Sequence, residues 1–205
     1  MRIRSSKVVV FLLTFFILLS QVFTSSFALA DNKVPFTIFH TNDMHGRLGY
    51  EEYKGKPTSF GSAREKALID KEKKENPNRT VIALDAGDAF QGLPVSNQSK
   101  GQDMAKAMNE IGYKAMAAGN HEFDFGLDTV EKYKNNPQNG GWLNFPILST
   151  NVYKDGKRLF EPSAIINENG VKIGIVGVTT PETATKTNPT GIKGVTFKKP
   201  IPEVT

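Results

Sequence analysis

Short apolar runs separated by polar, helix-like segments characterise the chain between about residues 35 and 150. Four of these runs have the composition of strands: Phe36–His40, Thr80–Leu84, Ala115–Ala117 and Pro146–Thr150. Thr80–Leu84 reads TVIAL, the continuous pattern expected of a strand covered on both faces. This alternation predicts an α/β fold rather than a helix bundle or an all-β sandwich.

Three helices are predicted between these strands. Ser62–Glu65 has the spacing of a capping box, and the Lys/Glu-rich segment that follows it stops at Asn76, which predicts a solvated surface helix. A second helix is predicted from about Asp103 to Ile111, ended by Gly112 as a left-handed cap. The third is predicted over Leu127–Lys134.

The pattern changes in the last quarter of the chain. Asp155-Gly156 and Asn169-Gly170 are type I′ hairpin signals, and they flank a predicted strand around Leu159–Ile166 that is followed by Val171–Val178. We expect an antiparallel or mixed part of the sheet here. The Thr- and Pro-rich tail from Thr179 predicts no closing element, and no repeat or linker divides the chain.

The first thirty residues have the organisation of a secretory signal peptide. A basic start precedes an apolar core, Val8–Leu19, and the small-x-small sequence that ends at Ala30 places cleavage before Asp31. The apolar core is shorter than the roughly 18 residues that span a bilayer. We therefore expect residues 1–30 to be removed, and the exported domain, residues 31–205, to lie in the cell envelope or outside the cell without stable membrane insertion.

The amino-acid composition limits the partners and the kinds of catalytic or metal site that the chain can have. Of 26 Lys and Arg residues, three lie in the predicted leader, which leaves 23 basic against 21 acidic groups. Such a surface gives no reason to expect a nucleic-acid polymer as partner. Cysteine is absent, so a disulfide framework, a thiolate nucleophile and a Cys-based zinc site are excluded. A metal would have to be held by His, Asp, Glu, Asn or backbone oxygen.

Polar residues follow three of the predicted strands. Asp43 and His45 follow the first, Asp88 the second and Asn120 the third. Ligands of α/β sheets bind outside the carboxyl ends of strands, so these residues should converge. On an extended segment Asp43 and His45 would point to one side and grip one cation. Asp88 could bridge two cations, and Asn120 could offer its amide oxygen to the second.

His121 and Asp124 suggest a different task. His121 could protonate a leaving oxygen, with Asp124 fixing its tautomer, while two divalent ions about 3.5–4 Å apart activate a water and stabilise a phosphoryl group. Each piece also has a structural interpretation: Asp43-Met44-His45 as a turn with a surface histidine, Asp88 as a helix cap, and Gly119–Glu122 as a turn. His40, within its strand, is interpreted as structural. The joint occurrence of the pieces at strand ends favours the metal site.

The motifs resemble those of the secreted bacterial 5′-nucleotidase family of calcineurin-like metallophosphoesterases. They are IFHTNDMHGRL (Ile38–Leu48), DAGD (Asp85–Asp88) followed by Gln91-Gly92, GNHEFDFG (Gly119–Gly126) and TTPET (Thr179–Thr183). The resemblance implies a four-layer α/β/β/α sandwich of two mixed sheets. It also implies that Asp43 and His45 bind a first metal, Asp88 bridges, Asn120 binds a second, and His121 with Asp124 forms the catalytic dyad.

The chain departs from the family pattern in its histidines. Family members supply a further histidine and a Gly-His-x-His segment later in the domain, and usually a second, substrate-binding domain. This sequence has three histidines, His40, His45 and His121. We therefore expect the sandwich to be incomplete at its C-terminus and the second metal to keep only Asp88 and Asn120.

The functional expectation is metal-dependent removal of phosphate from nucleoside 5′-monophosphates, with a nucleotide as substrate and two divalent ions (Mn, Zn, Mg or Ca) as cofactors. The family's other activities, hydrolysis of 2′,3′-cyclic nucleotides or of UDP-sugars, stay open, as does an inactive exported remnant. The sequence decides neither the metal nor the oligomeric state.

Overall fold

The computed structural model describes residues 33–204, and the chain divides into two units, Met1–Val34 and Pro35–Thr205. The predicted signal peptide lies outside the described residues. Within residues 33–204, none of the helices combines the length and the apolar character needed to cross a bilayer. Everything described below belongs to the second unit.

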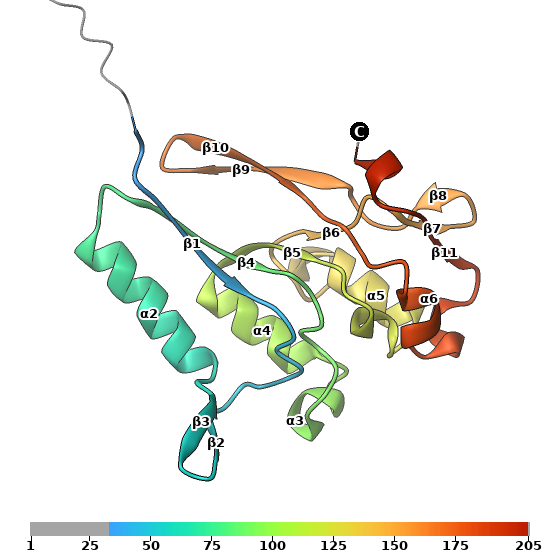
Figure 1. The fold of residues 1–205 in the computed structure, drawn as a ribbon, viewed down its shortest axis with the longest axis horizontal. Helices are drawn as coiled ribbons and strands as arrows, with labels where there is room; N and C mark the ends of the chain where they lie inside the picture. The colour runs from blue at the N-terminus through green and yellow to red at the C-terminus, as the bar shows by residue number, and fades with distance from the viewer. Residues whose placement is uncertain (1–32, 205) are drawn as a thin grey trace, which may run out of the picture. The chain divides into compact units, whose positions relative to one another are not determined.

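A four-stranded parallel sheet positions the site (Figure 1). Its strands run in the order β1-β4-β5-β6 and are parallel throughout: β1 (Phe36–Thr41), β4 (Thr80–Asp85), β5 (Tyr113–Ala117) and β6 (Ile147–Leu148). The four predicted strands are thus confirmed, although β6 is shorter than Pro146–Thr150. Thr80–Ala83 is fully buried, as the TVIAL pattern predicts. The α/β class is confirmed.

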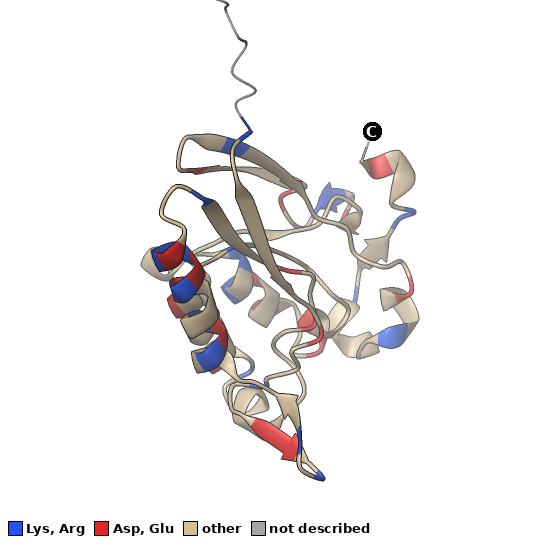
Figure 2. Cartoon of the chain, turned by 60° about the vertical axis from the view of Figure 1, so that its left-hand side comes forward, with Lys and Arg blue, Asp and Glu red and all other residues tan. Residues whose placement is uncertain are grey.

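Three main helices accompany this sheet: α2 (Ser62–Glu75), α4 (Gln102–Ile111) and α5 (Leu127–Lys134). Helix α2 is the solvated helix that the sequence predicts, with acidic and basic residues interspersed along its ribbon (Figure 2). Lys66 Nζ lies 2.9 Å from Asp70 Oδ2. Helix α4 ends at Gly112, whose φ of 90° and ψ of 38° make the predicted left-handed cap.

The predicted capping box of α2 is wrong. Gly61, with φ 75°, occupies the N-cap position, and the helix already begins at Ser62. The Ser62 hydroxyl is buried without a hydrogen-bond partner, while Glu65 accepts a hydrogen bond from the Tyr113 hydroxyl on β5. The Glu65 carboxylate, which a capping box would direct at the N-terminus of α2, therefore makes a tertiary hydrogen bond with Tyr113 instead.

Shorter elements connect the strands on the helix side. A hairpin of β2 (Glu51–Tyr53) and β3 (Lys56–Ser59) precedes α2, and α3 (Pro94–Asn97) precedes α4. Two single turns of 3₁₀ helix, η1 (His121–Phe123) and η2 (Pro137–Asn139), flank α5. The first of them carries a predicted catalytic residue.

Both type I′ hairpin signals are confirmed. β7 (Val152–Lys154) and β8 (Lys157–Arg158) flank the first turn, and β9 (Ser163–Glu168) and β10 (Val171–Val176) the second. The central residues of both turns have positive φ, between 50° and 79°. The start predicted for the longer strand is wrong: Leu159 and Phe160 are buried core residues that precede β9. The hairpins also form ladders separate from the parallel sheet: among the described strands, β9 pairs only with β10, and β7 and β8 belong to a three-stranded ladder.

The tail does contain a closing strand, contrary to expectation. β11 (Val195–Phe197) pairs antiparallel with β7. Along the chain, β11 is preceded by α6 (Thr183–Lys186) and η3 (Pro189–Ile192) and is followed by η4 (Ile201–Glu203). β11 has three residues and pairs with β7, which lies more than 40 residues earlier in the chain. A strand this short shows no clear hydrophobic periodicity, so the sequence pattern does not predict it.

An aromatic core fixes the loops that carry the site. Phe90 stacks on Tyr133 with ring centroids 4.2 Å apart, and Phe123 meets Phe160 and Phe197 edge to face at 5.9 and 5.4 Å. Phe123 is fully buried and directly follows the polar residues of η1. Packing thereby anchors η1 to the last quarter of the chain.

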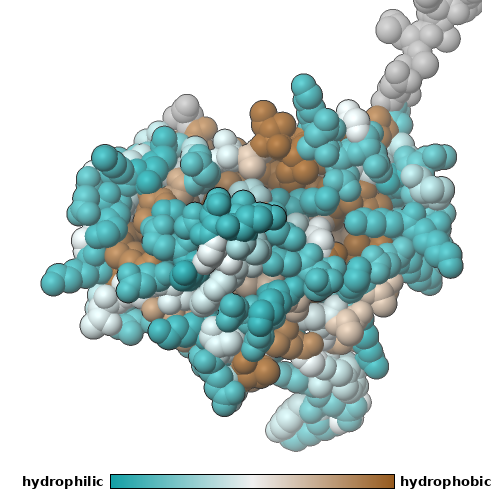
Figure 3. Space-filling model, turned by 180° about the vertical axis from the view of Figure 1, so that it is seen from behind, coloured by the Kyte–Doolittle hydropathy of each residue, from teal (hydrophilic) through white to brown (hydrophobic). Residues whose placement is uncertain are grey.

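The sheet face opposite α2 and α4 is only partly covered. The β9–β10 hairpin lies over it (Figure 1), and a cavity of about 330 Å³ remains, lined by Leu84, Ala115 and Ile175 among others. Apolar side chains reach the surface between polar ones (Figure 3), and Ile38 on β1 is 50% exposed. This face therefore presents apolar surface that the described residues do not bury.

Candidate metal centre

Three loops meet at the carboxyl edge of the parallel sheet. The backbone amide of Asp43 donates to the Gly87 carbonyl (3.0 Å) and that of His45 to the Asp88 carbonyl (2.9 Å), which extends the β1–β4 pairing past the strands. The His121 amide, from the loop after β5, donates to Asp88 Oδ1 at 2.9 Å. The three loops are thus joined by hydrogen bonds that main-chain amides donate, two to backbone carbonyls and one to the Asp88 carboxylate.

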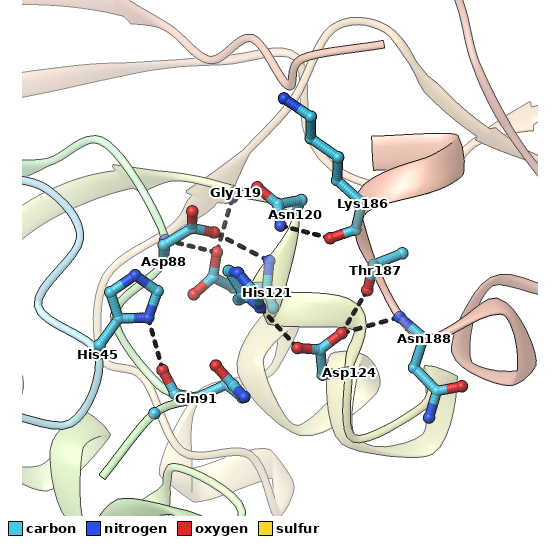
Figure 4. Close-up of polar contacts among 12 residues, drawn as sticks. His45, Asp88, Gln91, Gly119, Asn120, His121, Asp124, Lys186, Thr187 and Asn188 are labelled. Carbon is cyan, nitrogen blue, oxygen red and sulfur yellow. Dashed lines mark hydrogen bonds and ion pairs between the residues drawn. The ribbon is translucent and has the colours of Figure 1, made fainter. Parts of the chain in front are cut away.

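The side chains of His45, Asp88 and His121 form the centre of this region (Figure 4). One nitrogen or oxygen donor atom from each lies within 4.8 Å of the others, and each residue is partly buried. The two imidazole rings are 5.1 Å apart between centroids. Among the described residues, this is the one group of His, Asp or Glu side chains close enough to hold a single metal ion.

The backbone here is turned rather than extended. Asp43, His45 and Asp88 have φ values of 52°, 47° and 60°, in the left-handed region that non-glycine residues rarely adopt. The expectation that Asp43 and His45 share one side of an extended segment is therefore wrong. Their side chains nevertheless approach, with His45 Nε2 3.7 Å from Asp43 Oδ1. Left-handed residues cluster at functional sites, where they store about 1–3 kcal/mol each.

Gly87 allows two loops to approach closely. It has a φ of 103°, and a Cβ atom at this position would lie 2.6 Å from the backbone nitrogen of Gly119. A side chain here would force the Asp88 and Asn120 loops apart.

His45 is held in a defined tautomer. Its Nδ1 lies 2.8 Å from the Gln91 carbonyl oxygen. Because a carbonyl only accepts, Nδ1 carries the proton and Nε2 keeps its lone pair. Imidazoles that bind metals usually have this arrangement, with the second nitrogen donating to a backbone carbonyl or a carboxylate.

The two remaining predicted ligands lie at the margin of the centre. The side chain of Asp43 is 59% exposed, and its carboxylate accepts a hydrogen bond from the side-chain amide of Asn42. Asn120 donates from Nδ2 to the Lys186 carbonyl at 2.8 Å. Since that carbonyl accepts only from the NH₂ end, the Asn120 Oδ1 atom is left available to a cation.

His121 and Asp124 are hydrogen-bonded. His121 Nδ1 donates to Asp124 Oδ2 at 2.6 Å, and Asp124 Oδ1 accepts from the Thr187 hydroxyl (2.5 Å) and the Asn188 amide (3.0 Å). Burial lowers the pKa of His121, but the bond to Asp124 and the nearby Asp88 carboxylate outweigh it, so that pKa is raised. Burial raises the pKa of Asp124, but its hydrogen-bond donors outweigh this and the pKa is lowered. The pair favours a charged imidazolium beside a carboxylate.

Glu122, which the sequence analysis treats only as part of a turn, braces the loops. It is fully buried and accepts from the amides of Asp88 (2.8 Å), Gly119 (2.7 Å) and Ala89 (2.9 Å). Burial, with the Asp88 charge, raises the pKa of Glu122 to about 7 despite these donors. Its place within GNHEFDFG is the only sequence signal for this role.

A second polar network lies beneath the loops. Asp85 accepts from the Gly87 amide (2.8 Å) and the Thr41 hydroxyl (2.7 Å), and Thr41 is also 2.6 Å from the Tyr113 hydroxyl. Burial raises the pKa of Asp85 to about 7 and raises that of Tyr113 above its ordinary value. This network links the carboxyl ends of β1 and β4 to Tyr113 at the start of β5.

An open hollow adjoins the His121–Asp124 pair. It has a volume of about 520 Å³, and its lining includes Gln91, Asn97, Phe125, Lys186 and Asn188. Its walls are largely polar, and it lies next to the imidazole of His121, which is hydrogen-bonded to Asp124. The arrangement suits a polar ligand beside a proton donor.

Comparisons with known proteins agree with this architecture. The family model described as calcineurin-like phosphoesterase matches residues 36–204. The 5′-nucleotidases of Vibrio cholerae and Vibrio parahaemolyticus are 42% and 41% identical over 178 and 175 residues, which are 85% and 83% of this chain and 30% of each relative. Protein UshA of Escherichia coli is 36% identical over 99% of the chain and 36% of its own length.

A solved structure gives the same result. The 5′-nucleotidase precursor from Thermus thermophilus superimposes with a TM-score of 0.67 at 34% identity, covering 82% of this chain and 32% of that one. The resemblance inferred from the motifs is therefore confirmed. The chain spans about a third of the length of these relatives.

Proposed function

The chain belongs to the calcineurin-like phosphoesterase family, and from this we propose that it provides the cation-binding and proton-donating part of an exported hydrolase that removes phosphate from nucleoside 5′-monophosphates. The observation that carries the proposal is the junction of three strand-end loops around His45, Asp88 and His121, with His121 paired to Asp124. The names of the Vibrio relatives support the nucleotide as substrate.

The donor set would fit a first divalent ion and supply only part of the ligands of a second. Asp43, His45 and Asp88 would hold the first, and Asp88 with Asn120 the second. The free Nε2 of His45 and the available Oδ1 of Asn120 support this assignment. Bound ions would stabilise the phosphoryl oxygens and lower the pKa of an attacking water. Oxygen-rich donors of this kind accept Mn²⁺ or Mg²⁺, and the imidazole also suits Zn²⁺.

The residues of the chain would manage the leaving group. His121 would hold a proton at Nε2 and pass it to the departing ester oxygen, because Nδ1 is already committed to Asp124. Asp124 would keep the imidazole in that tautomer and stabilise its charged form. Thr187 and Asn188 would in turn hold Asp124. The polar hollow beside His121 would receive the departing nucleoside.

The partly covered sheet face supports the larger fold. We propose that the apolar surface opposite α2 and α4 packs against a second mixed sheet, giving the four-layer sandwich of the family. The cavity beside Leu84 and Ile175 and the exposed Ile38 support this.

A chimera tests the proposed activity. In it, this chain replaces the 178 aligned residues of the Vibrio cholerae 5′-nucleotidase, and phosphate release from AMP is measured with Mn²⁺. We expect turnover by the chimera and negligible turnover by the 205-residue chain alone. His121→Ala in the chimera should lower kcat by about 10²–10⁴-fold.

His40→Ala is the matched histidine control for that variant, since His40 lies outside the group formed by His45, Asp88 and His121. UDP-glucose and 2′,3′-cyclic AMP distinguish the family's other activities. A folded, Mn²⁺-binding chimera that hydrolyses none of these would overturn the proposal in favour of an inactive remnant, and robust hydrolysis by the 205-residue chain would show that no further ligands are needed.

Export is tested separately. Expressed with its own leader in a bacterium, the chain should be recovered outside the cytoplasm with Asp31 as its first residue by N-terminal sequencing. An intact form beginning at Met1 and held in the membrane would contradict cleavage.

A further inference from the structure

The TTPET motif, Thr179–Thr183, has no role in the proposed chemistry, although it is one of the four motifs that carry the family resemblance. We propose that its two buried threonines, Thr179 and Thr183, are positioning residues. They hold the segment that orients Asn120 and Asp124 against the loop that follows β5. Both threonines are buried, so neither is placed to contact a substrate. The inference rests on the proposed function, because it assigns the motif a role in that reaction.

Thr179 is bonded to the residue that begins the loop after β5. It is 1% exposed, and its hydroxyl donates to the carbonyl oxygen of Ala118 at 2.7 Å. A carbonyl oxygen only accepts, so the direction of this hydrogen bond is fixed. Ala118 is itself buried and lies two residues before Asn120. Thr179 thus ties the segment that follows β10 to the loop that carries Asn120.

The main chain of Thr179 is fixed as well. The side-chain amide of Asn151 accepts from the Thr179 amide at 2.9 Å and donates to the Thr179 carbonyl at 2.7 Å. Asn151 is fully buried and also donates to the Lys198 carbonyl at 2.8 Å. A buried amide with all of these bonds satisfied is held rigidly, and it holds its partner with it. The Thr179 hydroxyl therefore extends toward Ala118 from a main chain that is itself fixed.

Thr183 fixes the turn between Thr179 and α6. It is the first residue of α6 and is fully buried. Both its amide (3.1 Å) and its hydroxyl (2.7 Å) donate to the Thr180 carbonyl, which closes the turn. A helix of four residues is too short to be stable through its own hydrogen bonds. The position of α6 therefore depends on the turn that precedes it.

The residues placed by α6 are those that orient the site (Figure 4). The carbonyl of Lys186, the last residue of α6, accepts from Asn120 Nδ2, and Thr187 and Asn188 donate to Asp124. The same two segments are therefore joined twice, once through Thr179 and once through residues 186–188. If the first connection is lost, α6 can shift. The second set of hydrogen bonds then loses its geometry, to which such bonds are sensitive.

Thr180 provides a control within the motif itself. It is exposed, and its hydroxyl accepts a long hydrogen bond, 3.4 Å, from the Glu182 amide. Thr→Val substitutions keep the shape of the side chain and replace the hydroxyl by a methyl group. Thr180→Val should therefore leave the site unchanged, whereas Thr179→Val and Thr183→Val each remove one of the buried hydroxyls.

The first experiment observes the full, metal-free chain by NMR. The side-chain NH₂ signals of Asn120 report the hydrogen bond to Lys186, and the backbone amide of Asn188 reports the bond to Asp124. We expect Thr179→Val to shift both sets of signals, Thr183→Val to shift them less, and Thr180→Val to leave them in place. Thr179→Ser, which keeps the hydroxyl, should also leave them in place. Unshifted signals in folded Thr179→Val would overturn the inference, whatever the chain catalyses.

The second experiment measures turnover of AMP by the chimera with the Vibrio cholerae 5′-nucleotidase. Thr179→Val should lower kcat by about tenfold or more and change KM by less than about threefold, because a displaced proton donor slows the chemical step without removing a substrate contact. Thr179→Ser should keep kcat within about twofold of the unaltered chimera. A loss of kcat that is as large in Thr179→Ser as in Thr179→Val would assign the effect to packing and contradict the positioning role.

The two experiments separate this inference from the proposed function. A chimera that is inactive with every substrate counts against the proposed function, and the NMR comparison still decides the positioning role. A folded Thr179→Val chimera that turns over as fast as the unaltered one overturns the inference and leaves the proposed function intact. If Thr179→Val does not fold, Thr183→Val decides: it must shift the Asn120 side-chain signals, and unshifted signals refute the inference.

Discussion

The two halves of the described chain contribute differently to the site. The first, β1 to β6, contains the parallel sheet, whose loops carry every residue predicted to bind metal or move a proton. The second, β7 to η4, consists of short antiparallel ladders and contains none of them. It nevertheless orients two of those residues, because the Lys186 carbonyl fixes the Asn120 amide and Thr187 and Asn188 hold Asp124.

The first half supplies the reactive groups, and the second half orients two of them. The reactive groups come from strand ends, where a parallel sheet brings loops together whatever their sequence separation. The orientation of Asn120 and Asp124 comes from one backbone carbonyl, one backbone amide and one hydroxyl that lie 63 to 66 residues further along the chain. Breaking the contacts between the two halves should therefore misorient Asn120 and Asp124 without removing any residue that is predicted to bind metal or move a proton.

Phe123→Ala should have the largest effect. Phe123 is fully buried and packs on Phe160 and Phe197 of the second half. Removing the ring leaves a cavity at the joint, which costs about 3–5 kcal/mol of unfolding free energy. Urea denaturation of the metal-free chain measures it. Phe60→Ala, at a side chain that is 62% exposed, is the control and should stay within about 0.5 kcal/mol.

Glu122→Gln tests the bracing within the first half alone. The variant replaces one acceptor oxygen by an NH₂ group, so at least one of the amides of Asp88, Ala89 and Gly119 loses its partner. We expect a loss of about 1–3 kcal/mol at neutral pH. Glu110→Gln, at an exposed position on α4, should have little effect. Equal stability of the two variants would show that the buried carboxylate does not brace the loops.

Asp124→Asn breaks the polar joint and should show a pH dependence of definite sign. Asp124 raises the pKa of His121, so its contribution to stability is fully present below the unfolded histidine pKa, about 6.5, and is lost as pH rises through the folded value. The stability difference between wild type and variant should therefore be largest near pH 5, below the histidine pKa and above the lowered pKa of the Asp124 carboxyl.

Two measurements check the Asp124→Asn prediction. Denaturation at pH 5 and pH 8 gives the difference in stability, and an NMR titration of the metal-free chain should show a lower pKa for His121 in the variant. Asp128→Asn, at an exposed residue of α5, serves as the control. A gap that widens with rising pH would contradict the assignment of the pair.

Thr187→Val should have the smallest effect. It removes one hydrogen bond to Asp124, worth about 0.5–1.5 kcal/mol, while the Asn188 amide still holds the same oxygen. The pKa of His121 should fall by less than in Asp124→Asn, and Thr187→Ser should restore it. Thr185→Val, whose hydroxyl bonds only to the Glu182 carbonyl, should leave that pKa unchanged. An unaltered His121 titration in Thr187→Val would confine the second half to a structural role.

Local signals in the sequence predicted much of the fold. Leu127–Lys134 is helical over the predicted range, Gly112 caps α4, and both hairpin turns have the predicted backbone. Each of these features is decided by residues adjacent in the chain. The wrong predictions concern contacts between residues far apart in the chain. Glu65 accepts a hydrogen bond from Tyr113 instead of forming a capping box, and β11 of the tail pairs with β7.

For the candidate site, the sequence by itself predicted which residues would carry chemistry and that they follow strands that lie side by side in one parallel sheet. Composition and spacing suffice for this, because side-chain type and strand periodicity are properties of the local sequence. Only the tertiary structure decided that Asp43 and His45 lie on a left-handed turn, that Glu122 ties two loops together, and that Lys186 orients Asn120. These contacts use main-chain amides and carbonyls, which every residue possesses, so no sequence pattern marks their partners before the chain has folded.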